Sequence, residues 1–209
     1  MTENRESFFR RLAPFLAPSV IQEVELAYTL AKYGHRQQLR KELSEDGNPI
    51  RYFEHVRRSA IVLIEEAQIV DAPTIISLLL HDVVEDAPNL PPALIERFLG
   101  TEVVTTVKTV SKDPKEGYLE RFFMSTNWRA YLVKACDRLD NLRSMGSCGP
   151  EFRKKQVAET REKYYPLFDR MVELVPTELR PRAQRLRDLV RAECERQATL
   201  LEVVGLLST

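Results

Sequence analysis

Residues Ser77–Asp86 read S-L-L-L-H-D-V-V-E-D, and the rest of the chain is organised around this stretch. The adjacent residues His81 and Asp82 follow directly on the apolar run Ile75–Leu80. An apolar run of this kind predicts a buried helix, so we expect the two polar side chains to be held on that helix rather than in a loop. By itself, a His-Asp pair favours an ordinary capped helix end whose acids are solvated over a metal site.

Two further acidic residues follow at helical spacing. Because side chains four residues apart share one face of a helix, His81 is expected to align with Glu85. Asp82 is expected to align with Asp86 in the same way. An imidazole beside carboxylates suits a transition-metal site, so this helix end is a candidate metal-binding segment.

Length and composition narrow the class of protein. A chain of 209 residues fits one domain, and its 44% hydrophobic content argues against wholesale disorder. The 31 basic and 31 acidic residues balance, so we expect no nucleic-acid partner. Three widely spaced cysteines fit reduced intracellular thiols. With no secretion signal and no apolar run near the ~18 residues of a membrane helix, we expect a cytoplasmic protein without a membrane segment.

Helical periodicity dominates the sequence, and seven glycines with few alternating β-branched residues leave little room for a sheet. The spacing of apolar residues predicts helices over residues 7–16, 20–33, 52–68, 74–86, 92–99, 102–110, 118–125, 127–145, 151–175 and 177–203. Residues 35–52 are expected to form a polar loop, since they contain Asp-Gly and Asn-Pro dipeptides. The predicted fold class is therefore all-α.

Two regions outside the central helix carry candidate functional residues. Arg40 and Lys41 in the predicted loop are suited to phosphate contacts, although these residues by themselves favour a solvated loop. Asp137 lies in the middle of the amphipathic helix 127–145, where a carboxylate needs a metal or an ion-pair partner to offset desolvation. Asn141 and Ser144 follow Asp137 on the same strip of that helix.

The order His55, His81-Asp82, Asp137 is typical of HD-domain metal-dependent phosphohydrolases. Within that superfamily the chain resembles the hydrolase domain of the Rel/SpoT alarmone enzymes and their stand-alone small relatives. The resemblance rests on four motifs that follow the family's order, at residues 35–56, Leu79–Ala87 (L-L-H-D-V-V-E-D-A), Lys134–Ser144 (K-A-C-D-R-L-D-N-L-R-S) and Glu159–Leu167 (E-T-R-E-K-Y-Y-P-L). It covers about residues 20–175.

This resemblance implies an HD-domain helical bundle with a single Mn²⁺ ion and a nucleotide substrate. The implied metal ligands are His55, His81, Asp82 and Asp137. The implied catalytic residues, which position and activate the attacking water, are Glu85 and Asp86. The implied substrate contacts are Arg40, Lys41, Asn141, Ser144, Tyr164 and Lys112.

The implied reaction is removal of the 3′-pyrophosphate of guanosine 3′,5′-bispyrophosphate (ppGpp or pppGpp) to give GDP or GTP and pyrophosphate. One alternative is a phosphohydrolase for another purine nucleotide such as ppApp, in which case the protein would suit the role of an antitoxin to a small alarmone synthetase. The other is an HD module that binds nucleotide without turnover. The complete set of metal-type ligands argues against this last alternative.

The sequence departs from the family pattern at three places. Val56 follows His55 where the family commonly has proline, and the segment before Gly47 is longer than usual, which leaves the register of the Arg40–Lys41 segment open. Asp140 replaces a histidine of the family, which places an extra negative charge one turn from the predicted metal site. We expect this charge to tune metal binding or the choice of purine.

We divide the chain into an N-terminal helical extension (residues 1–19), an HD-type hydrolase domain (20–175) and a C-terminal helix (176–209). Apolar residues at heptad-like spacing in the last helix, such as Leu186 and Val190, are expected to pack on the domain or on a second copy, which would make a homodimer. No synthetase domain is expected in this chain, so the predicted activity is hydrolysis alone.

Overall fold

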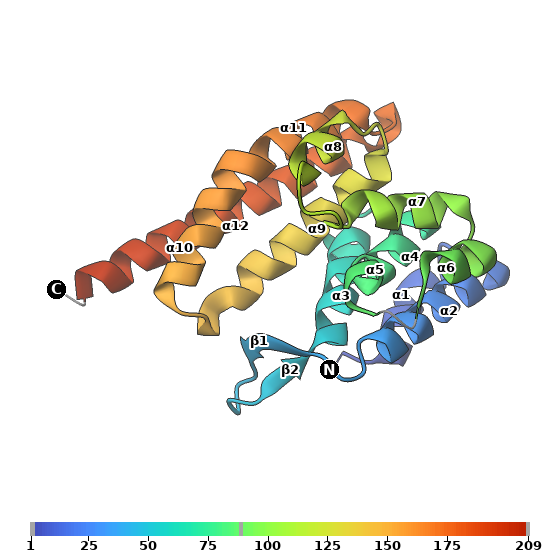
Figure 1. Ribbon diagram of the computed structural model, residues 1–209, viewed down its shortest axis with the longest axis horizontal. Helices are drawn as coiled ribbons and strands as arrows, with labels where there is room; N and C mark the ends of the chain where they lie inside the picture. The colour runs from blue at the N-terminus through green and yellow to red at the C-terminus, as the bar shows by residue number, and fades with distance from the viewer. Residues whose placement is uncertain (1–2, 88–89, 208–209) are drawn as a thin grey trace.

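The computed structural model describes residues 3–87 and 90–207, and it is almost wholly helical (Figure 1). Its α-helices are α1 (Arg5–Leu12), α2 (Pro18–Gly34), α3 (Tyr52–Ile61), α4 (Ala72–Leu80), α5 (Val83–Asp86), α6 (Pro92–Leu99), α7 (Thr101–Val110), α8 (Tyr118–Met124), α9 (Trp128–Ser144), α10 (Pro150–Glu159), α11 (Tyr165–Leu174) and α12 (Arg180–Leu207). The π-helical segment Val62–Glu66 continues α3, and Thr160–Tyr164 joins α10 to α11. The predicted all-α fold class is confirmed. Among the helices described, none combines the length and apolar character that a membrane crossing requires.

Helix α9 lies at the centre of the molecule (Figure 1). It packs against α3, α4 and α7 on one side and against α11 and α12 on the other. Every residue from Ala130 to Asp140 is buried, including the charged residues Lys134, Asp137 and Arg138. Because a buried charge is stable only when it is paired or bound to a metal, the partners of these residues define the polar centre of the fold.

The N-terminal helix is part of the same core. Phe8 and Leu12 of α1 are fully buried. The ring of Phe8 contacts Tyr28 of α2, and Tyr28 packs edge-on against Phe53 at the start of α3, with ring centroids 4.7 Å apart. Helix α2 also packs along α4. Helices α1 and α2 therefore hold α3 and α4 in place.

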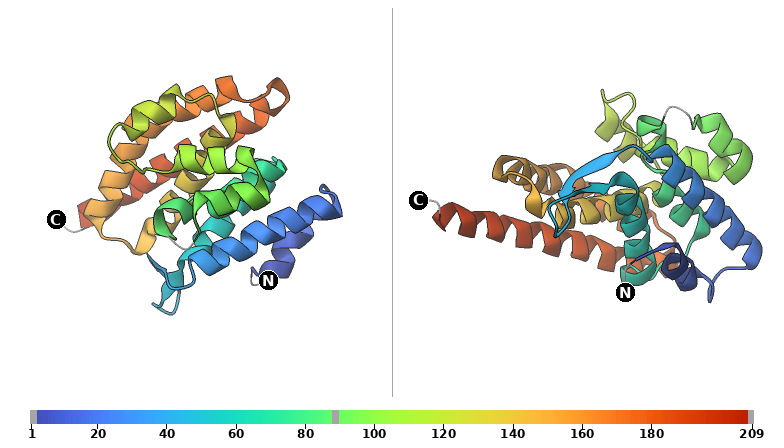
Figure 2. Two further views of the ribbon diagram at one scale, coloured as in Figure 1. Left: turned by 45° about the vertical axis from the view of Figure 1, so that its right-hand side comes forward. Right: turned by 90° about the horizontal axis from the view of Figure 1, so that it is seen from below.

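The C-terminal helix α12 covers the other side of α9. It packs against α9, α10 and α11 (Figures 1 and 2). Its buried residues include Ala183, Leu186, Val190 and Cys194. These residues recur on one face of the helix, which is the pattern expected of a helix that covers a core.

The prediction of a plain loop over residues 35–52 is wrong. This segment contains an antiparallel hairpin of β1 (Leu39–Leu43) and β2 (Pro49–Arg51), which projects beside the end of α9 (Figure 2). The turn includes Gly47 at φ +77°, a conformation that glycine adopts without strain. On β1, Arg40 and Glu42 are half-buried and their neighbours are exposed, as expected for alternating sides of a strand.

The prediction of one continuous helix over residues 74–86 is also wrong. Helix α4 ends at Leu80 and α5 begins at Val83, so His81 and Asp82 lie at a break between two helices. The Nδ1 atom of His81 lies 2.8 Å from the carbonyl oxygen of Leu78. In an uninterrupted helix that carbonyl would accept from the N–H of Asp82, so the side chain replaces a backbone bond at this point.

Candidate metal centre and adjoining pocket

Three separate elements bring four polar side chains to one point in the core. His55 comes from α3, His81 and Asp82 from the α4–α5 break, and Asp137 from the middle of α9. The Nε2 atom of His55 lies 3.2 Å from Oδ1 of Asp137, and the Nε2 atom of His81 lies 3.0 Å from Oδ2 of Asp82. The structure therefore brings together all four residues that the sequence predicts as metal ligands.

The two imidazoles are oriented alike. Each Nδ1 atom has a partner, at 2.7 Å from Oδ2 of Asp140 for His55 and at 2.8 Å from the carbonyl oxygen of Leu78 for His81. Each Nε2 atom is buried and has no hydrogen-bond partner within the described part of the chain. Such a ring donates its Nδ1–H and leaves the Nε2 lone pair free, which is the tautomer that binds metals through Nε2.

The spacing of these donor atoms fits a single divalent ion. Ligand atoms about 2.1 Å from a metal are separated by about 3.0 Å in octahedral geometry and about 3.4 Å in tetrahedral geometry. The short separations of 3.0 and 3.2 Å lie in this range. The cross-separations, from His81 to Asp137 and from His55 to Asp82, are 3.7 and 3.9 Å. His55, His81 and Asp82 form a group whose ligand atoms all lie within 4.8 Å of one another, and Asp137 adjoins this group through its contacts with the two ring nitrogens.

Charge at this point favours a cation. Burial alone raises the pKa of Asp137, but Lys134 and the two imidazoles hold it well below its ordinary value. Burial likewise raises the pKa of Asp82, but the charge and hydrogen bond of His81 and the charge of His55 together lower it further than burial raises it. Burial lowers the pKa of His81, yet Asp82 and Asp137 raise it to about 10, so without an ion its Nε2 carries a proton that a bound cation would replace. Cationic neighbours keep the two carboxylates ionised, and the carboxylates in turn favour positive charge at the point where the ring nitrogens meet.

Each carboxylate is also held by a neighbour. The Nζ atom of Lys134 donates to Oδ2 of Asp137 at 2.9 Å, and the side-chain amide of Asn141 donates to Oδ1. The phenol of Tyr52 donates to Oδ2 of Asp82 at 2.6 Å. Burial and then the charge of Asp82 raise the pKa of Tyr52, so the phenol keeps its proton and remains a donor.

Asp140 contacts the site directly, whereas the sequence predicts only an extra negative charge one turn away. Its two oxygens are shared between the ring of His55 and the guanidinium of Arg58. Burial raises the pKa of Asp140, but His55 and Arg58 lower it further than burial raises it. The charge of Asp140 is therefore compensated.

The acidic pair at the end of α5 lies at the edge of the centre. Oε1 of Glu85 accepts a hydrogen bond from the backbone N–H of Lys112, at 2.5 Å, so Glu85 fixes the start of the loop after α7. Asp86 lies at the surface, but its carboxyl group is partly shielded from water. This partial burial, followed by the charges of Asp82 and Glu85, raises its pKa. A raised pKa makes this carboxylate a stronger proton acceptor than an ordinary aspartate.

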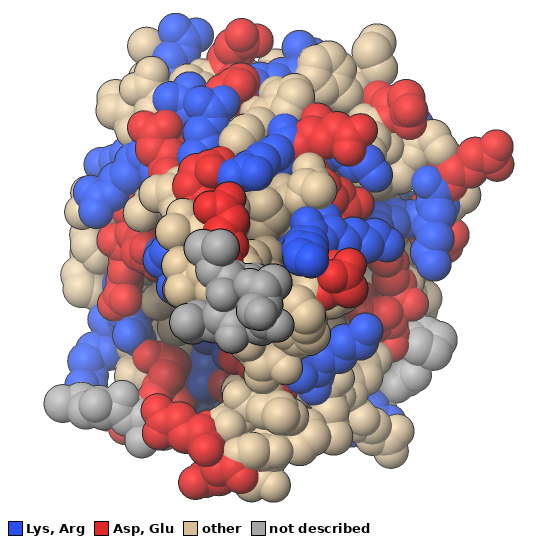
Figure 3. Space-filling model, turned by 90° about the vertical axis from the view of Figure 1, so that its left-hand side faces the viewer, with Lys and Arg blue, Asp and Glu red and all other residues tan. Residues whose placement is uncertain are grey.

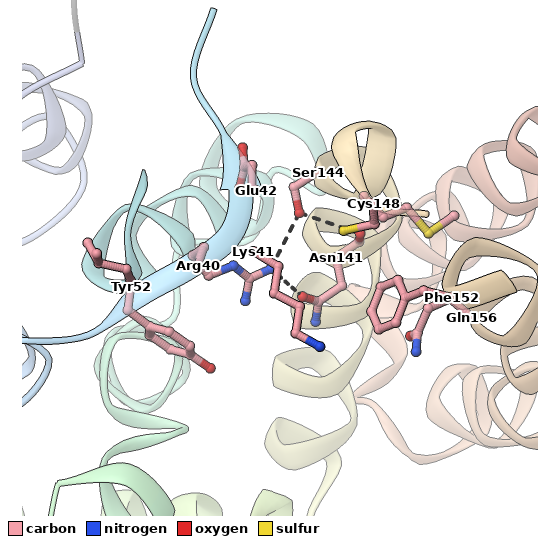
Figure 4. Close-up of a pocket in the computed structure, with 11 residues that line it drawn as sticks. Arg40, Lys41, Glu42, Tyr52, Asn141, Ser144, Cys148, Phe152 and Gln156 are labelled. Atoms are coloured by element: carbon pink, nitrogen blue, oxygen red, sulfur yellow. Dashed lines mark hydrogen bonds between the residues drawn. The ribbon is translucent and has the colours of Figure 1, made fainter. Parts of the chain in front are cut away.

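A cavity of about 300 Å³ opens beside the metal centre, between the hairpin and the ends of α9 and α10 (Figure 4). It is lined by Leu39, Arg40, Lys41, Glu42, Tyr52, Asn141, Ser144, Met145, Cys148, Phe152 and Gln156. Four of the predicted substrate contacts (Arg40, Lys41, Asn141 and Ser144) therefore meet in one cavity. The guanidinium of Arg40 donates to Oδ1 of Asn141 at 2.7 Å and lies over the ring of Tyr52.

The other two predicted substrate contacts lie in a separate cavity. Lys112 and Tyr164 line a space of about 300 Å³ together with Lys115, Tyr118 and Glu159, among others. Tyr164 is buried beneath the guanidinium of Arg138, whose central carbon lies 3.8 Å from the ring centroid. The structure therefore does not bring Lys112 and Tyr164 into the pocket that holds Arg40.

Sequence reasoning missed several residues of this site. Tyr52 separates the pocket from Asp82, and its other side stacks on the buried His35, with ring centroids 4.8 Å apart. Phe152 lies below the ammonium group of Lys41. The spacing of Lys134 and Asp137, three residues apart on one helix, is a local signal that could have predicted this partner for the buried acid.

The surface around the site is mixed in charge. On the face that carries the end of α12, Lys and Arg side chains alternate with Asp and Glu side chains (Figure 3). This distribution agrees with the balanced composition of the chain.

Comparison with known proteins identifies relatives of this chain. No family model matches it. The chain is 33% identical over 187 residues to the bifunctional (p)ppGpp synthase/hydrolase SpoT of Escherichia coli (strain K12), covering 83% of this chain and 25% of SpoT. It is 35% identical over 163 residues to a guanosine-3′,5′-bis(diphosphate) 3′-pyrophosphohydrolase of Aquifex aeolicus, covering 74% of this chain and 22% of that protein. The chain thus spans about a quarter of the length of these curated relatives.

A solved structure shows the same fold. It belongs to a metazoan orthologue of SpoT that is described as hydrolysing ppGpp, with a TM-score of 0.59 and 27% sequence identity. The match covers 84% of this chain and 95% of the solved chain. The helical fold and the sequence relatives agree, and over most of its own length the chain is similar to the HD-type Rel/SpoT hydrolases.

Proposed function

We propose that this chain hydrolyses ppGpp or pppGpp at the 3′-pyrophosphate, giving GDP or GTP and pyrophosphate. The observation that carries the proposal is the convergence of two free imidazole nitrogens with Asp82 and Asp137 beside a pocket lined by Arg40 and Asn141. The likeness to enzymes named as 3′-pyrophosphohydrolases supports the same reaction.

We propose Mn²⁺ as the resident ion, with His55, His81, Asp82 and Asp137 as its ligands. Two imidazoles and two carboxylates form a mixed nitrogen and oxygen donor set that suits a first-row transition metal. When bound, such an ion supplies Lewis acidity, which makes water a stronger nucleophile near neutral pH and polarises a phosphoryl group.

Glu85 and Asp86 orient the attacking water and accept its proton in this proposal. The raised pKa of Asp86, due to burial and to the charges of Asp82 and Glu85, supports a role as proton acceptor. The hydrogen bond from the backbone of Lys112 holds Glu85 in a fixed direction.

The reaction balances as a hydrolysis. The water oxygen bonds to the phosphorus that is attached to O3′ of the ribose. The bond between that phosphorus and O3′ breaks, and O3′ leaves with a proton as the 3′-hydroxyl. Pyrophosphate is the second product, and no oxidant or reductant is required.

The nucleotide occupies the cavity beside the hairpin in this proposal. The guanidinium of Arg40 has the fork geometry that binds phosphate oxygens, and Lys41 adds a second positive charge. Asn141 and Ser144 offer hydrogen bonds to the nucleoside. The face of Phe152 offers a stacking surface at the far end of the cavity.

Lys112 and Tyr164 would contact the phosphate end of the substrate from the second cavity. Lys112 lies near the start of the loop that Glu85 anchors, so its positive charge lies beside the acidic pair. A cation at this place lowers the cost of bringing an anionic phosphate near Glu85 and Asp86.

The test is a pyrophosphate-release assay on protein stripped with chelator and then supplied with Mn²⁺. The substrates compared are ppGpp, ppApp and dGTP, with Asp82→Ala as the inactive control. We expect Mn²⁺-dependent release of pyrophosphate from ppGpp and none from the Asp82→Ala variant. Release from ppApp alone would favour the adenine alternative. Absence of release from either alarmone, in protein that binds Mn²⁺, would contradict the proposed reaction.

We propose in addition that a second copy of the chain packs on the end of α12. Leu200 and Val203 are exposed there, at 39% and 47% of their surface. Light scattering coupled to size exclusion tests this proposal, since a Val203→Glu variant of a dimer should elute as a monomer. A wild-type monomer would contradict it.

A further inference from the structure

We propose that Asp140 is a positioning residue for the metal ligand His55, and that Arg58 holds Asp140 in place. The proposal rests on the metal site proposed above. It concerns how the ring of His55 is aimed, which neither the motif nor the choice of ligands explains.

The contact between the two residues is short and buried. Oδ2 of Asp140 lies 2.7 Å from Nδ1 of His55, and the two residues expose 3% and 0% of their surface. They come from α9 and α3, which are 85 residues apart in sequence. No bulk water can replace Asp140 as the acceptor, so a buried Nδ1–H would lose its partner if Asp140 were removed.

This hydrogen bond decides which ring nitrogen faces the metal. When Nδ1 carries the proton and donates it to Asp140, Nε2 keeps its lone pair. Nε2 then points to Asp137, 3.2 Å away, and to Asp82, 3.9 Å away. A carboxylate behind a histidine ligand also raises the basicity of the ring and limits its rotation.

Arg58 makes a buried carboxylate tolerable at this position. Its Nε atom donates to Oδ1 of Asp140 at 2.7 Å, and its Nη2 atom donates to Oδ2 at 3.0 Å. This two-point contact fixes the plane of the carboxylate, and its charge compensates that of Asp140. The charge of the ligand set is therefore left to Asp82 and Asp137, which matches a divalent ion.

The same group of residues reaches the pocket. Nη2 of Arg58 also donates to Glu42 of β1 at 2.7 Å, and Glu42 lines the cavity beside the metal centre. Arg40, two residues earlier on the same side of β1, bonds Asn141, which in turn bonds Asp137. Strand β1 is thus linked to His55 through Arg58 and Asp140, and to Asp137 through Asn141. Asp140 therefore helps to hold both the proposed metal centre and the pocket.

The experiment measures the dissociation constant of Mn²⁺ by calorimetry, on chelator-stripped full-length protein far below its melting temperature. We expect Asp140→Ala to weaken Mn²⁺ binding by about 10- to 100-fold. Asp140→Asn keeps an oxygen that accepts from Nδ1 but loses the charge, so it should restore part of the affinity. The matched control is Glu66→Gln, which breaks the two-point ion pair with Arg143 on α9 without touching a ligand and should leave Mn²⁺ affinity unchanged.

Thermal unfolding of the same metal-free proteins separates positioning from stability. A melting temperature lowered as much in Asp140→Ala as in Glu66→Gln, with Mn²⁺ affinity lost only in the former, supports positioning. Unchanged Mn²⁺ affinity in Asp140→Ala would overturn this inference and leave the proposed function intact. If the alanine variant does not fold, wild-type affinity in Asp140→Asn overturns the inference instead. Failure of the wild-type protein to bind Mn²⁺ would overturn the proposed function, and the inference with it.

Discussion

The phenol of Tyr52 donates a hydrogen bond of 2.6 Å to Asp82, so a residue that lines the proposed nucleotide pocket also holds a proposed metal ligand. The ring is fixed from behind by the buried imidazole of His35, which stacks on it. Tyr52 is therefore one direct connection between the cavity and the proposed metal centre.

Tyr52→Phe should keep the stacked ring and remove only the hydrogen bond to Asp82. A hydrogen bond to a charged group contributes about 1.5–3 kcal/mol, so we expect Mn²⁺ affinity to fall by roughly tenfold or somewhat more. Calorimetry with Mn²⁺ on the stripped protein gives this number, and far-ultraviolet circular dichroism checks the fold. An unchanged dissociation constant would mean that Asp82 does not need the phenol to bind the ion.

Asp82→Ala should abolish Mn²⁺ binding and turnover while the helical content persists. The side chain lies at the break between α4 and α5, where neither helix depends on it for a hydrogen-bonded cap. Asp188→Ala, which removes an exposed acid from α12, is the matched control and should behave as wild type. Turnover that survived in Asp82→Ala would remove this residue from the ligand set.

The four proposed ligands were predicted from the family resemblance, and periodicity added only that the segments beside them are apolar and lie in the core. Val56, Ala60 and Leu63 mark the buried face of the segment that carries His55, and a continuous run of apolar residues leads to His81. The helical periodicity of the apolar residues places these segments in the core. A core holds few polar clusters, because each buried polar group needs a partner.

The hairpin could not be predicted in the same way. The sequence L-R-K-E-L of β1 has the alternation of a strand, but its inward residues Arg40 and Glu42 are charged, so the pattern reads as a polar loop. These residues face inward because they have partners 101 and 16 residues away, Asn141 and Arg58. Such partners exist only in the folded chain.

The role of Asp140 was hidden for the same reason. Its contacts with Arg58 and His55 join α9 to α3 across 82 and 85 residues of sequence. A sequence shows an added acid near a motif, but it does not show that the acid is paired. The break of the helix at His81 likewise depends on the direction of one side chain, which local periodicity does not contain.

Glu85→Gln distinguishes two roles for that residue. The amide oxygen of glutamine can still accept from the backbone of Lys112, so the loop after α7 should stay in place, but the negative charge is lost. If Glu85 acts on the water, turnover should fall by about 10²- to 10⁴-fold with Mn²⁺ still bound. If Glu85 only anchors the loop, Glu85→Gln should be nearly as active as wild type, and only Glu85→Ala should be impaired.

Asp86→Asn should stabilise the metal-free protein at neutral pH. The pKa of Asp86 is higher in the folded chain than in the unfolded chain, owing to burial and to Asp82 and Glu85. Folding therefore favours the protonated form, and the carboxylate costs stability once the pH rises above its unfolded value of about 3.9. The gain in melting temperature should be present at pH 7 and disappear below about pH 4.

The same substitution tests the reaction. If Asp86 accepts the proton of the attacking water, wild-type turnover should rise with pH through the raised pKa of Asp86, and this rise should be absent in Asp86→Asn. A variant that kept both the rise and the rate would show that another group accepts the proton.

Arg40→Ala should raise the KM for ppGpp more than it lowers kcat. Its guanidinium faces the cavity and bonds Asn141, so its loss removes a phosphate contact but leaves the four proposed ligands in place. One charge-assisted contact corresponds to roughly 10- to 100-fold in KM. Arg40→Lys should recover only part of this loss, because an ammonium group cannot make the two-point contact. Arg36→Ala is the matched control, since Arg36 lies over the ring of Tyr33 and does not line the cavity. If Arg36→Ala and Arg40→Ala raised KM equally, nucleotide affinity would depend only on the overall positive charge of the surface. The nucleotide would then not occupy this pocket.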